Sequence, residues 1–227
     1  TGVNNLGGLC YELYSGTMTG CYNTGRITAT GTYVGGLMGY AKQATITNAY
    51  STGDVTTEKT LMGGLIGVME KSALTNAYTT GKVTTAAASG AIGAAVGSAD
   101  QVSNVYYLGS ASAIGDENAT AKTAEELKAL APMLGSSFKE NTGCGGYPLL
   151  VWQEARAHQY ENGVCTVCGA KDPAAPYLLD GVTDAAAEVQ TGKSYQLDDL
   201  MDGKIFGVKN GTLTYKNYFY TMSSDGG

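Results

Sequence analysis

Basic residues are scarce in this sequence. Its 227 residues hold 14 lysines and arginines against 20 acidic residues, a formal net charge of −6. Binding to nucleic-acid backbones needs a basic patch, and none is visible, so we expect no nucleic-acid partner. The sequence also has no run of 18 apolar residues, so we expect no membrane insertion from this chain. The sequence has one histidine, so it offers little for a histidine-based active site.

Glycine and tyrosine are plentiful instead, with 33 and 16 copies, and hydrophobic residues reach 43%. The apolar residues are spaced rather than clustered, which favours a folded chain over a disordered tail. The chain opens at Thr1 without a charged and apolar leader and ends at Gly227 just after strand-like residues. We therefore expect it to be part of a longer polypeptide.

A repeat of 28 residues organises the first half of the chain. Four tyrosines keep this spacing and form one column: Tyr22, Tyr50, Tyr78 and Tyr106. The same spacing relates Gly-Gly-Leu triplets that end at Leu9, Leu37 and Leu65, and aligns Met18 with Ile46 and Leu74. A fixed period of this length is typical of a solenoid.

Each repeat alternates polar and apolar residues and is rich in threonine, valine and tyrosine, which favours strands. One repeat cannot bury its own apolar face, but stacked coils can, with the leucines in one interior ladder. Asn48, Asn76 and Asn104 also align, and we expect them to form a ladder at a corner. The sequence thus predicts an all-β fold, a right-handed parallel β-helix of about four coils over residues 1–115.

The repeat resembles a known family. Gly35-Gly36-Leu37-Met38-Gly39, followed by Asn48-Ala49-Tyr50-Ser51-Thr52-Gly53-Asp54-Val55, is similar to the GLUG repeat. Such repeats occur in large bacterial surface and secreted proteins, so the resemblance implies an extracellular or cell-surface location. The fourth coil departs from the pattern at Ala91-Ile92-Gly93, which suits a terminal coil.

After the repeats, residues 116–155 are expected to form a helical cap over the open end of the solenoid. Thr123 and Glu126 form a capping-box pattern that opens a helix from Ala124 to about Ala131, with Pro132 ending it. Gly146-Tyr147-Pro148-Leu149-Leu150-Val151-Trp152 resembles a closing signature that follows such repeats, and Trp152 is interpreted as core of the cap.

Residues 156–175 carry a candidate metal site. Cys165 and Cys168 form a Cys-x-x-Cys knuckle, His158 lies seven residues earlier, and Cys144 could supply a fourth ligand. The segment resembles a His/Cys-x-x-Cys linker of bacterial surface proteins. Structural zinc is one interpretation; a Cys165–Cys168 disulfide, a disulfide to Cys144, or free thiols are the others. Cys10 and Cys21 are expected to be buried free thiols inside the solenoid.

Residues 176–227 are expected to form a small, incomplete β module that resembles the start of an Ig-like or cadherin-like sandwich. Its strands would include Tyr195-Gln196-Leu197, Lys204-Ile205-Phe206 and Thr212–Tyr218.

For function, the acidic residues of the coils share no aligned column, and Asp54 aligns with Arg26 and Lys82. A glycosidase-like site needs paired carboxylates, so we expect no enzyme activity. The sequence predicts a non-catalytic bacterial surface module that adheres to host glycans, matrix or mucin proteins, or acts as a stalk for other domains of the polypeptide. The alternative is a non-catalytic accessory region of a secreted polysaccharide-degrading enzyme or peptidase.

The tyrosine column would stack on ligands if it faces outward, and an inward or half-buried orientation is the favoured interpretation.

Overall fold

The computed structural model describes residues 6–87, 90, 92–111, 114–161, 164–170 and 172, and the backbone of three short strands at 177–178, 188–189 and 207–208. The chain divides into two compact units. The first comprises Thr1–Thr142 with Gly146–Ala155, and the second Gly143–Gly145 with Arg156–Gly227. In the described part of the chain, no helix has the length and apolar character needed to cross a membrane.

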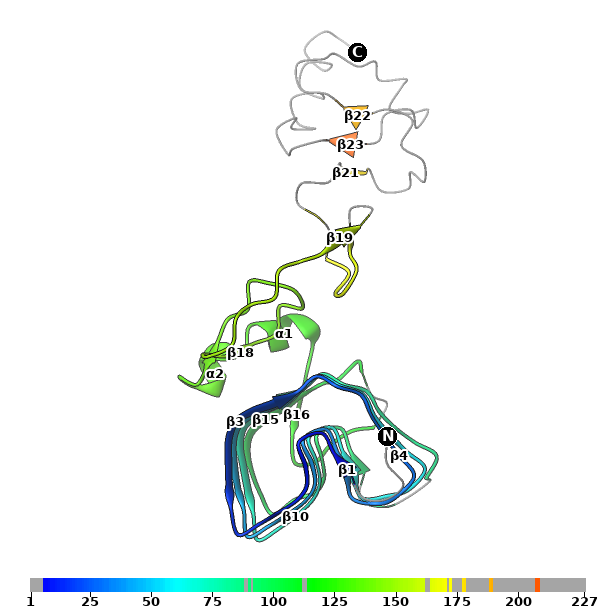
Figure 1. Cartoon of the computed structure of the whole chain (residues 1–227), viewed down its shortest axis with the longest axis vertical. Coiled ribbons are helices and arrows are strands. Elements are labelled where there is room, and N and C mark those ends of the chain that lie inside the picture. Colours follow the sequence, from blue (N-terminus) through cyan, green and yellow to red (C-terminus); the bar gives the residue numbers. More distant parts are fainter. Residues whose placement is uncertain are drawn as a thin grey trace. The chain divides into compact units, whose positions relative to one another are not determined.

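The first unit is a solenoid whose coils overlie one another when viewed along the stack (Figure 1). Strands that are equivalent in successive coils pair into four sheets. The first sheet contains β1 (Leu6–Gly7), β5 (Val34–Gly35), β9 (Met62–Gly63) and β13 (Ile92–Gly93). The second contains β2 (Cys10–Tyr14), β6 (Met38–Lys42), β10 (Ile66–Glu70) and β14 (Val96–Ser98). The third contains β3 (Thr17–Asn23), β7 (Thr45–Ser51), β11 (Ala73–Thr79), β15 (Gln101–Leu108) and β16 (Thr120–Lys122). The fourth contains β4 (Ile27–Ala29), β8 (Val55–Thr57) and β12 (Val83–Thr85).

Every strand pairing between these coils is parallel, and most join residues 28 apart, such as Tyr22 with Tyr50 and Tyr50 with Tyr78. This confirms the all-β solenoid of about four coils and agrees with the expected β-helix. The fourth coil departs from the strict period, because Met62 pairs with Ile92 and Gly63 with Gly93, 30 residues apart. The spacing returns to 28 where Leu74 pairs with Val102. The alignment of Gly63 with Ala91 implied by an unbroken repeat is therefore wrong by two residues.

The interior of the solenoid is a ladder of apolar side chains. Leu37, Leu65, Ile46 and Leu74 have no exposed surface, as the repeat predicted. Leu9 is 44% exposed, because the first coil has a described neighbour on one side only. Cys10 and Cys21 lie in this first coil too. They are free thiols but half-buried rather than buried, which corrects the expectation of full burial.

The asparagine column forms the predicted corner ladder. Asn48, Asn76 and Asn104 all adopt left-handed backbone conformations, with φ between 54° and 60°. Asparagine tolerates this region better than most residues. The Asn76 amide donates to Asn48 Oδ1 at 3.3 Å, and Asn104 donates to Asn76 Oδ1 at 2.9 Å. In the first coil Gly20 occupies the column with φ 63°, so the departure from asparagine preserves the backbone shape.

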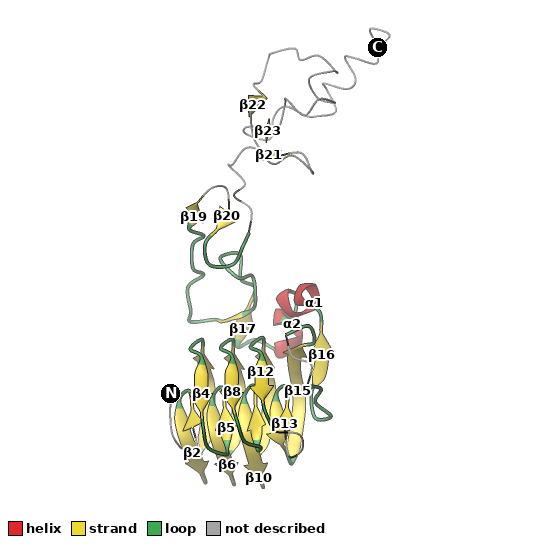
Figure 2. Cartoon of the chain, turned by 90° about the vertical axis from the view of Figure 1, so that its right-hand side faces the viewer, coloured by secondary structure: helices red, strands yellow, loops and turns green. Residues whose placement is uncertain are grey.

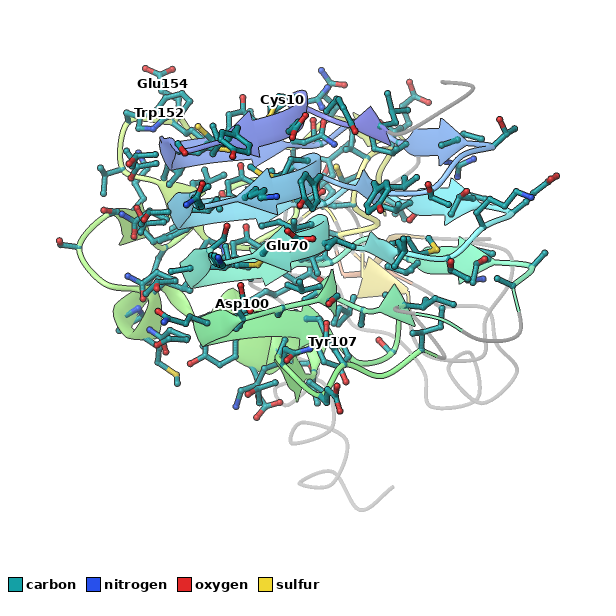
Figure 3. All side chains as sticks on the ribbon, turned by 90° about the horizontal axis from the view of Figure 1, so that it is seen from below. Cys10, Glu70, Asp100, Tyr107, Trp152 and Glu154 are labelled. Atoms are coloured by element: carbon teal, nitrogen blue, oxygen red, sulfur yellow. The ribbon has the colours of Figure 1, made fainter. Side chains whose placement is uncertain are left out.

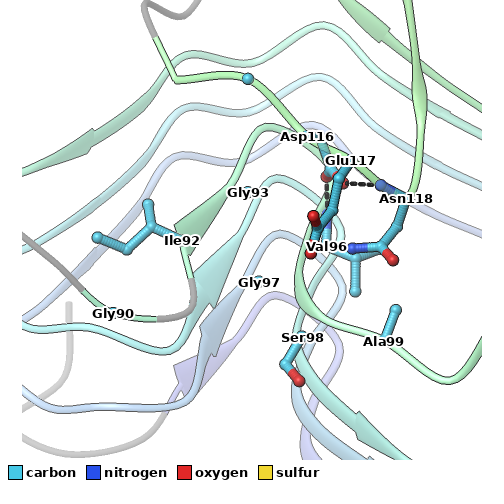
Figure 4. A pocket seen from close by; sticks show the side chains of 11 residues that line it. Gly90, Ile92, Gly93, Val96, Gly97, Ser98, Ala99, Asp116, Glu117 and Asn118 are labelled. Atoms are coloured by element: carbon cyan, nitrogen blue, oxygen red, sulfur yellow. Dashed lines mark hydrogen bonds between the residues drawn. The ribbon is translucent and has the colours of Figure 1, made fainter.

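The stack ends at a carboxylate. In the inner coils, the carbonyl oxygen of Leu65 accepts hydrogen bonds from both Leu37 N and Met38 N. In the last coil, Asp116 Oδ2 takes the place of that carbonyl and accepts from Ala95 N at 2.7 Å and Val96 N at 2.6 Å (Figure 4). One side chain thus accepts from the two N–H groups that the carbonyl of a further coil would otherwise bind. Unpaired backbone groups at the open edge of a sheet are a liability, and Asp116 removes two of them.

The cap packs beside the stack rather than only over its end. The capping box is present, with Glu126 N donating to Thr123 Oγ1 at 3.2 Å. However, the first helix, α1 (Ala124–Lys128), ends before Pro132, and Pro132 lies in the first turn of a second helix, α2 (Ala131–Leu134). With β17 (Phe138–Lys139) and β18 (Leu149–Leu150), these helices cover the outer side of the third sheet, near β15 and β16 (Figure 2).

The second unit contains an antiparallel pair, β19 (Tyr160–Glu161) and β20 (Val164–Cys165). Farther along the chain, β21 (Tyr177–Leu178), β22 (Glu188–Val189) and β23 (Gly207–Val208) form a small sheet. The strands expected at Tyr195–Leu197, Lys204–Phe206 and Thr212–Tyr218 lie outside the described residues.

We expect Asp116→Ala to lower the free energy of unfolding by about 2 kcal/mol, because the backbone N–H groups of Ala95, Val96 and Asn118 lose their carboxylate acceptor. Urea denaturation measures the change. Glu117→Ala removes the adjacent exposed carboxylate and should stay within about 0.5 kcal/mol of the parent. Equal effects of the two substitutions would contradict the role of Asp116 in ending the stack.

At the asparagine corner, Asn76→Ala should destabilise the protein by about 2–3 kcal/mol, since alanine resists the left-handed conformation and the amide ladder is cut. Asn76→Gly also cuts the ladder but adopts the conformation easily, so it should cost about 1 kcal/mol. The two midpoints of thermal or urea unfolding can be compared directly. If glycine proved as harmful as alanine, backbone conformation would not govern this corner.

Candidate functional site

Four side chains predicted as metal ligands come together in the second unit. The ligand atoms of Cys144, His158, Cys165 and Cys168 all lie within 4.8 Å of one another. Cys144 Sγ is 3.6 Å from Cys165 Sγ, and Cys168 Sγ is 3.4 Å from His158 Nδ1. Residues separated by up to 24 positions thus form one compact group, which we call the Cys3His cluster.

Backbone hydrogen bonds hold the Cys-x-x-Cys knuckle in shape. Cys165 ends β20, and its N–H donates to Ala170 O at 2.7 Å. Gly169 follows with φ 73°, a conformation suited to glycine, and donates to Cys165 O at 2.9 Å. This tight turn brings Cys168 back beside Cys165.

The other two members are held by the preceding segment. The Cys144 N–H donates to Arg156 O at 2.7 Å, which places Cys144 near the segment that carries His158 and leads into β19. The imidazole of His158 stacks on Tyr160, with ring centroids 5.3 Å apart and an interplanar angle of 16°. Stacking on Tyr160 therefore helps to fix the orientation of the imidazole ring.

The distances suit a tetrahedral thiophilic ion. Zinc–sulfur bonds of about 2.3 Å and zinc–nitrogen bonds of about 2.0–2.1 Å imply edges of roughly 3.8 Å between two sulfurs and roughly 3.6 Å between sulfur and nitrogen. The observed 3.6 Å and 3.4 Å lie close to these edges. The cluster could therefore hold a metal ion.

Local hydrogen bonds favour thiolates in the knuckle. Burial raises the pKa of the Cys165 thiol, but backbone N–H groups of Val167 and Cys168 outweigh burial and bring its pKa to about 5. The Ala170 N–H lowers the pKa of Cys168. Burial and the neighbouring thiols raise the pKa of Cys144 to about 12. Thiolates formed in the knuckle would make a locally negative group that a cation would stabilise.

All five cysteines are free thiols in the structure. The Sγ atoms of Cys144 and Cys165 are 3.6 Å apart, well beyond the disulfide bond length of about 2.05 Å. Neither of the disulfide alternatives corresponds to this arrangement, whereas free thiols and a metal site both do.

The tyrosine column lies on the outer side of the third sheet, under the cap. Tyr22, Tyr50 and Tyr78 stack with centroids 5.2 and 5.0 Å apart. Tyr50 is 3% exposed, Tyr78 0% and Tyr106 6%, and they form a second core with the leucines of the cap. Three of the four tyrosines proposed to stack on a ligand therefore have no free ring face, while Tyr22 is half-buried.

The buried hydroxyls of this column form hydrogen bonds with the cap. The Tyr50 hydroxyl and the Gln153 side-chain amide lie within 3.0 Å, and the Tyr78 hydroxyl donates to Pro148 O. Burial raises the pKa of Tyr50 to about 12, although its bond to Gln153 opposes the shift. Sequence reasoning missed Gln153 and Asp116, because neither belongs to a repeat column.

Trp152 is not core, contrary to its sequence interpretation. It is 62% exposed and sits at the end of the tyrosine column, 5.8 Å from the Tyr22 ring (Figure 3). The indole nitrogen lies 3.7 Å from the position that a Cβ at Gly20 would occupy. The first coil therefore makes room for the indole at a position where the other coils have asparagine.

Comparison with known proteins gives one match. Residues 30–56 match the family model of the GLUG motif. The matched stretch contains β5, β6 and β7 and is about one coil long, so it supports the solenoid and the motif resemblance for that coil. No curated protein and no solved structure matches the chain.

Proposed function

We propose that the chain is a non-catalytic module of an extracellular bacterial surface protein, in which the solenoid is a rigid element for adhesion or display. The observation that carries this proposal is the in-register stack of parallel coils with a GLUG match in its second coil. Solenoids of this kind extend by repeating one short unit and present long, regular faces. Host glycans, matrix or mucin proteins and other domains of the same polypeptide are the proposed partners.

The roles of the acidic residues support a non-catalytic module. Asp54 pairs with Arg26 at 3.1 Å and accepts from Lys82 N at 3.0 Å. Glu70 lies 3.5 Å from Lys42, and Asp116 is engaged by the backbone. These carboxylates therefore contribute to the packing of the coils and of the end of the stack, which supports a structural role for them.

A binding and turnover screen tests this proposal. The purified chain should release no new reducing ends from polysaccharides and no peptides from mucin, because it carries no catalytic function. Surface plasmon resonance on immobilised mucin, collagen and fibronectin, with a glycan array beside it, measures adhesion in the same preparation. Turnover of any substrate would overturn the non-catalytic assignment, and stable binding without turnover would favour adhesion over display.

We further propose that the Cys3His cluster is a structural zinc site. Four protein ligands would close the coordination sphere, as in structural rather than catalytic zinc sites. The ion would connect Cys144, His158 and the knuckle, which lie on three different stretches of chain. Because the two strands of β19 and β20 form only a short pair, metal binding would supply much of the order of this segment.

Metal analysis of the reduced full chain tests this site. We expect one zinc per chain by elemental analysis and strong cobalt–thiolate absorption after substitution with Co²⁺. Cys168→Ser should lower the affinity by at least about tenfold, while Cys21→Ser in the solenoid should leave stoichiometry and affinity unchanged. A thiol titration that finds only three of the five cysteines reactive in metal-free, non-reduced protein would instead support a disulfide.

A further inference from the structure

Four further tyrosines of the described coils gather on a different sheet. Tyr11 is 45% exposed and Tyr14 60%, and both belong to β2. Tyr40 of β6 and Tyr33, just before β5, are half-exposed. Together with Glu12, Lys42 and Glu70 they form what we call the tyrosine face, on the outer side of the second sheet (Figure 3, where Glu70 is labelled). The cap covers the third sheet and leaves this face uncovered.

The centre of the tyrosine face is closely packed. Tyr40 pairs in register with Val68 of the next coil, so both point to the same side. Val68 lies outside the interior core of the solenoid and yet is only 8% exposed. A Cβ at Gly39 would meet Tyr33 O at 2.2 Å, so glycine allows the Tyr33 corner to approach the sheet closely. The rings of Tyr33 and Tyr40 consequently meet edge to face, with centroids 5.6 Å apart at 66°.

Neighbouring polar groups hold these rings in place. Tyr40 is hydrogen-bonded to Glu70, which raises the pKa of the phenol to about 12. Glu70 in turn lies 3.5 Å from Lys42, whose ammonium is 5.9 Å from the centre of the Tyr14 ring. Side chains that are ordered before binding lose less conformational entropy when a ligand arrives.

The charge of this face indicates the chemistry of its partner. Glu70 is already neutralised by Lys42, so a cationic partner would gain little from it. The carboxylate of Glu12 would repel a polyanion. What the face offers is aromatic surface, whose negative π face attracts C–H groups, beside oxygen atoms that accept hydrogen bonds from hydroxyls. A pyranose ring presents both groups.

We propose that the tyrosine face binds a neutral polysaccharide, with Tyr11, Tyr33 and Tyr40 stacking on sugar rings and Glu12 and Glu70 accepting from sugar hydroxyls. This inference rests on the proposed function, since it assigns the adhesive face of the solenoid and its ligand class. It also moves the stacking surface from the buried tyrosine column to the opposite, uncovered part of the coil.

Affinity electrophoresis and calorimetry on the full chain test the proposal. The probes are soluble neutral polysaccharides, namely mixed-linkage glucan, xylan, mannan and galactomannan, with polygalacturonate, heparin and polylysine as charged probes. We expect binding to at least one neutral polymer and not to the charged ones. Tyr40→Ala and Tyr11→Ala should each weaken it about tenfold or more, whereas Tyr40→Phe, which keeps the ring, should weaken it only a few-fold.

Trp152→Ala is the matched control, because Trp152 is also an exposed aromatic residue but contacts Tyr22 on another sheet. It should leave binding unchanged, and circular dichroism with melting curves confirms that each variant is folded. Failure of the parent to bind any neutral polymer overturns the inference and leaves a display function standing. Loss of binding in Trp152→Ala but not in the tyrosine variants also overturns it, as does preferential binding of a charged probe. Release of reducing ends from the bound polymer would instead refute the non-catalytic assignment.

Discussion

The parallel hydrogen-bond ladder between successive coils is the constraint on which the rest of the structure depends. It joins residues 28 apart through most of the stack, so each coil places its leucines, asparagines and tyrosines directly beside those of its neighbour. Three consequences follow from this repetition: an apolar interior, a corner held by asparagine amides, and an outer tyrosine stack that a cap can bury. A ladder of this kind has open ends, and Asp116 is the device that satisfies part of one of them.

The repeat made the coil architecture predictable from the sequence. Columns such as Leu37 with Leu65 and Asn76 with Asn104 identify interior and corner positions, because stacked coils must present equivalent residues to one another. The fourth coil was harder to align, since two extra residues before Ile92 and two fewer before Gln101 cancel out and leave the overall period unchanged. The Thr123 capping box was also recognisable, because it depends on local spacing alone.

The sequence predictions failed for side chains whose burial depends on contacts with distant parts of the chain. The outward direction of the tyrosine column could not be known without the kink at each asparagine, and its burial depends on a cap that begins some 70 residues after Tyr50. Trp152 looked like core because tryptophan usually is, but its place at the end of the column leaves it exposed. In contrast, the Cys3His cluster could be proposed because few residue types bind metals, although only the fold could show that Cys144 reaches the knuckle.

The two surfaces of the solenoid therefore have different roles: the third sheet is covered by the cap, and the second sheet presents tyrosines to solvent. This division depends on the coils being stacked in parallel register. Hydrogen exchange followed by mass spectrometry tests that claim most directly in the intact chain. Peptides covering β6, β7, β10 and β11, which are paired on both sides, should exchange most slowly, and those covering β2 and β3 measurably faster. Equally fast exchange in the central and first coils would contradict the stacked ladder.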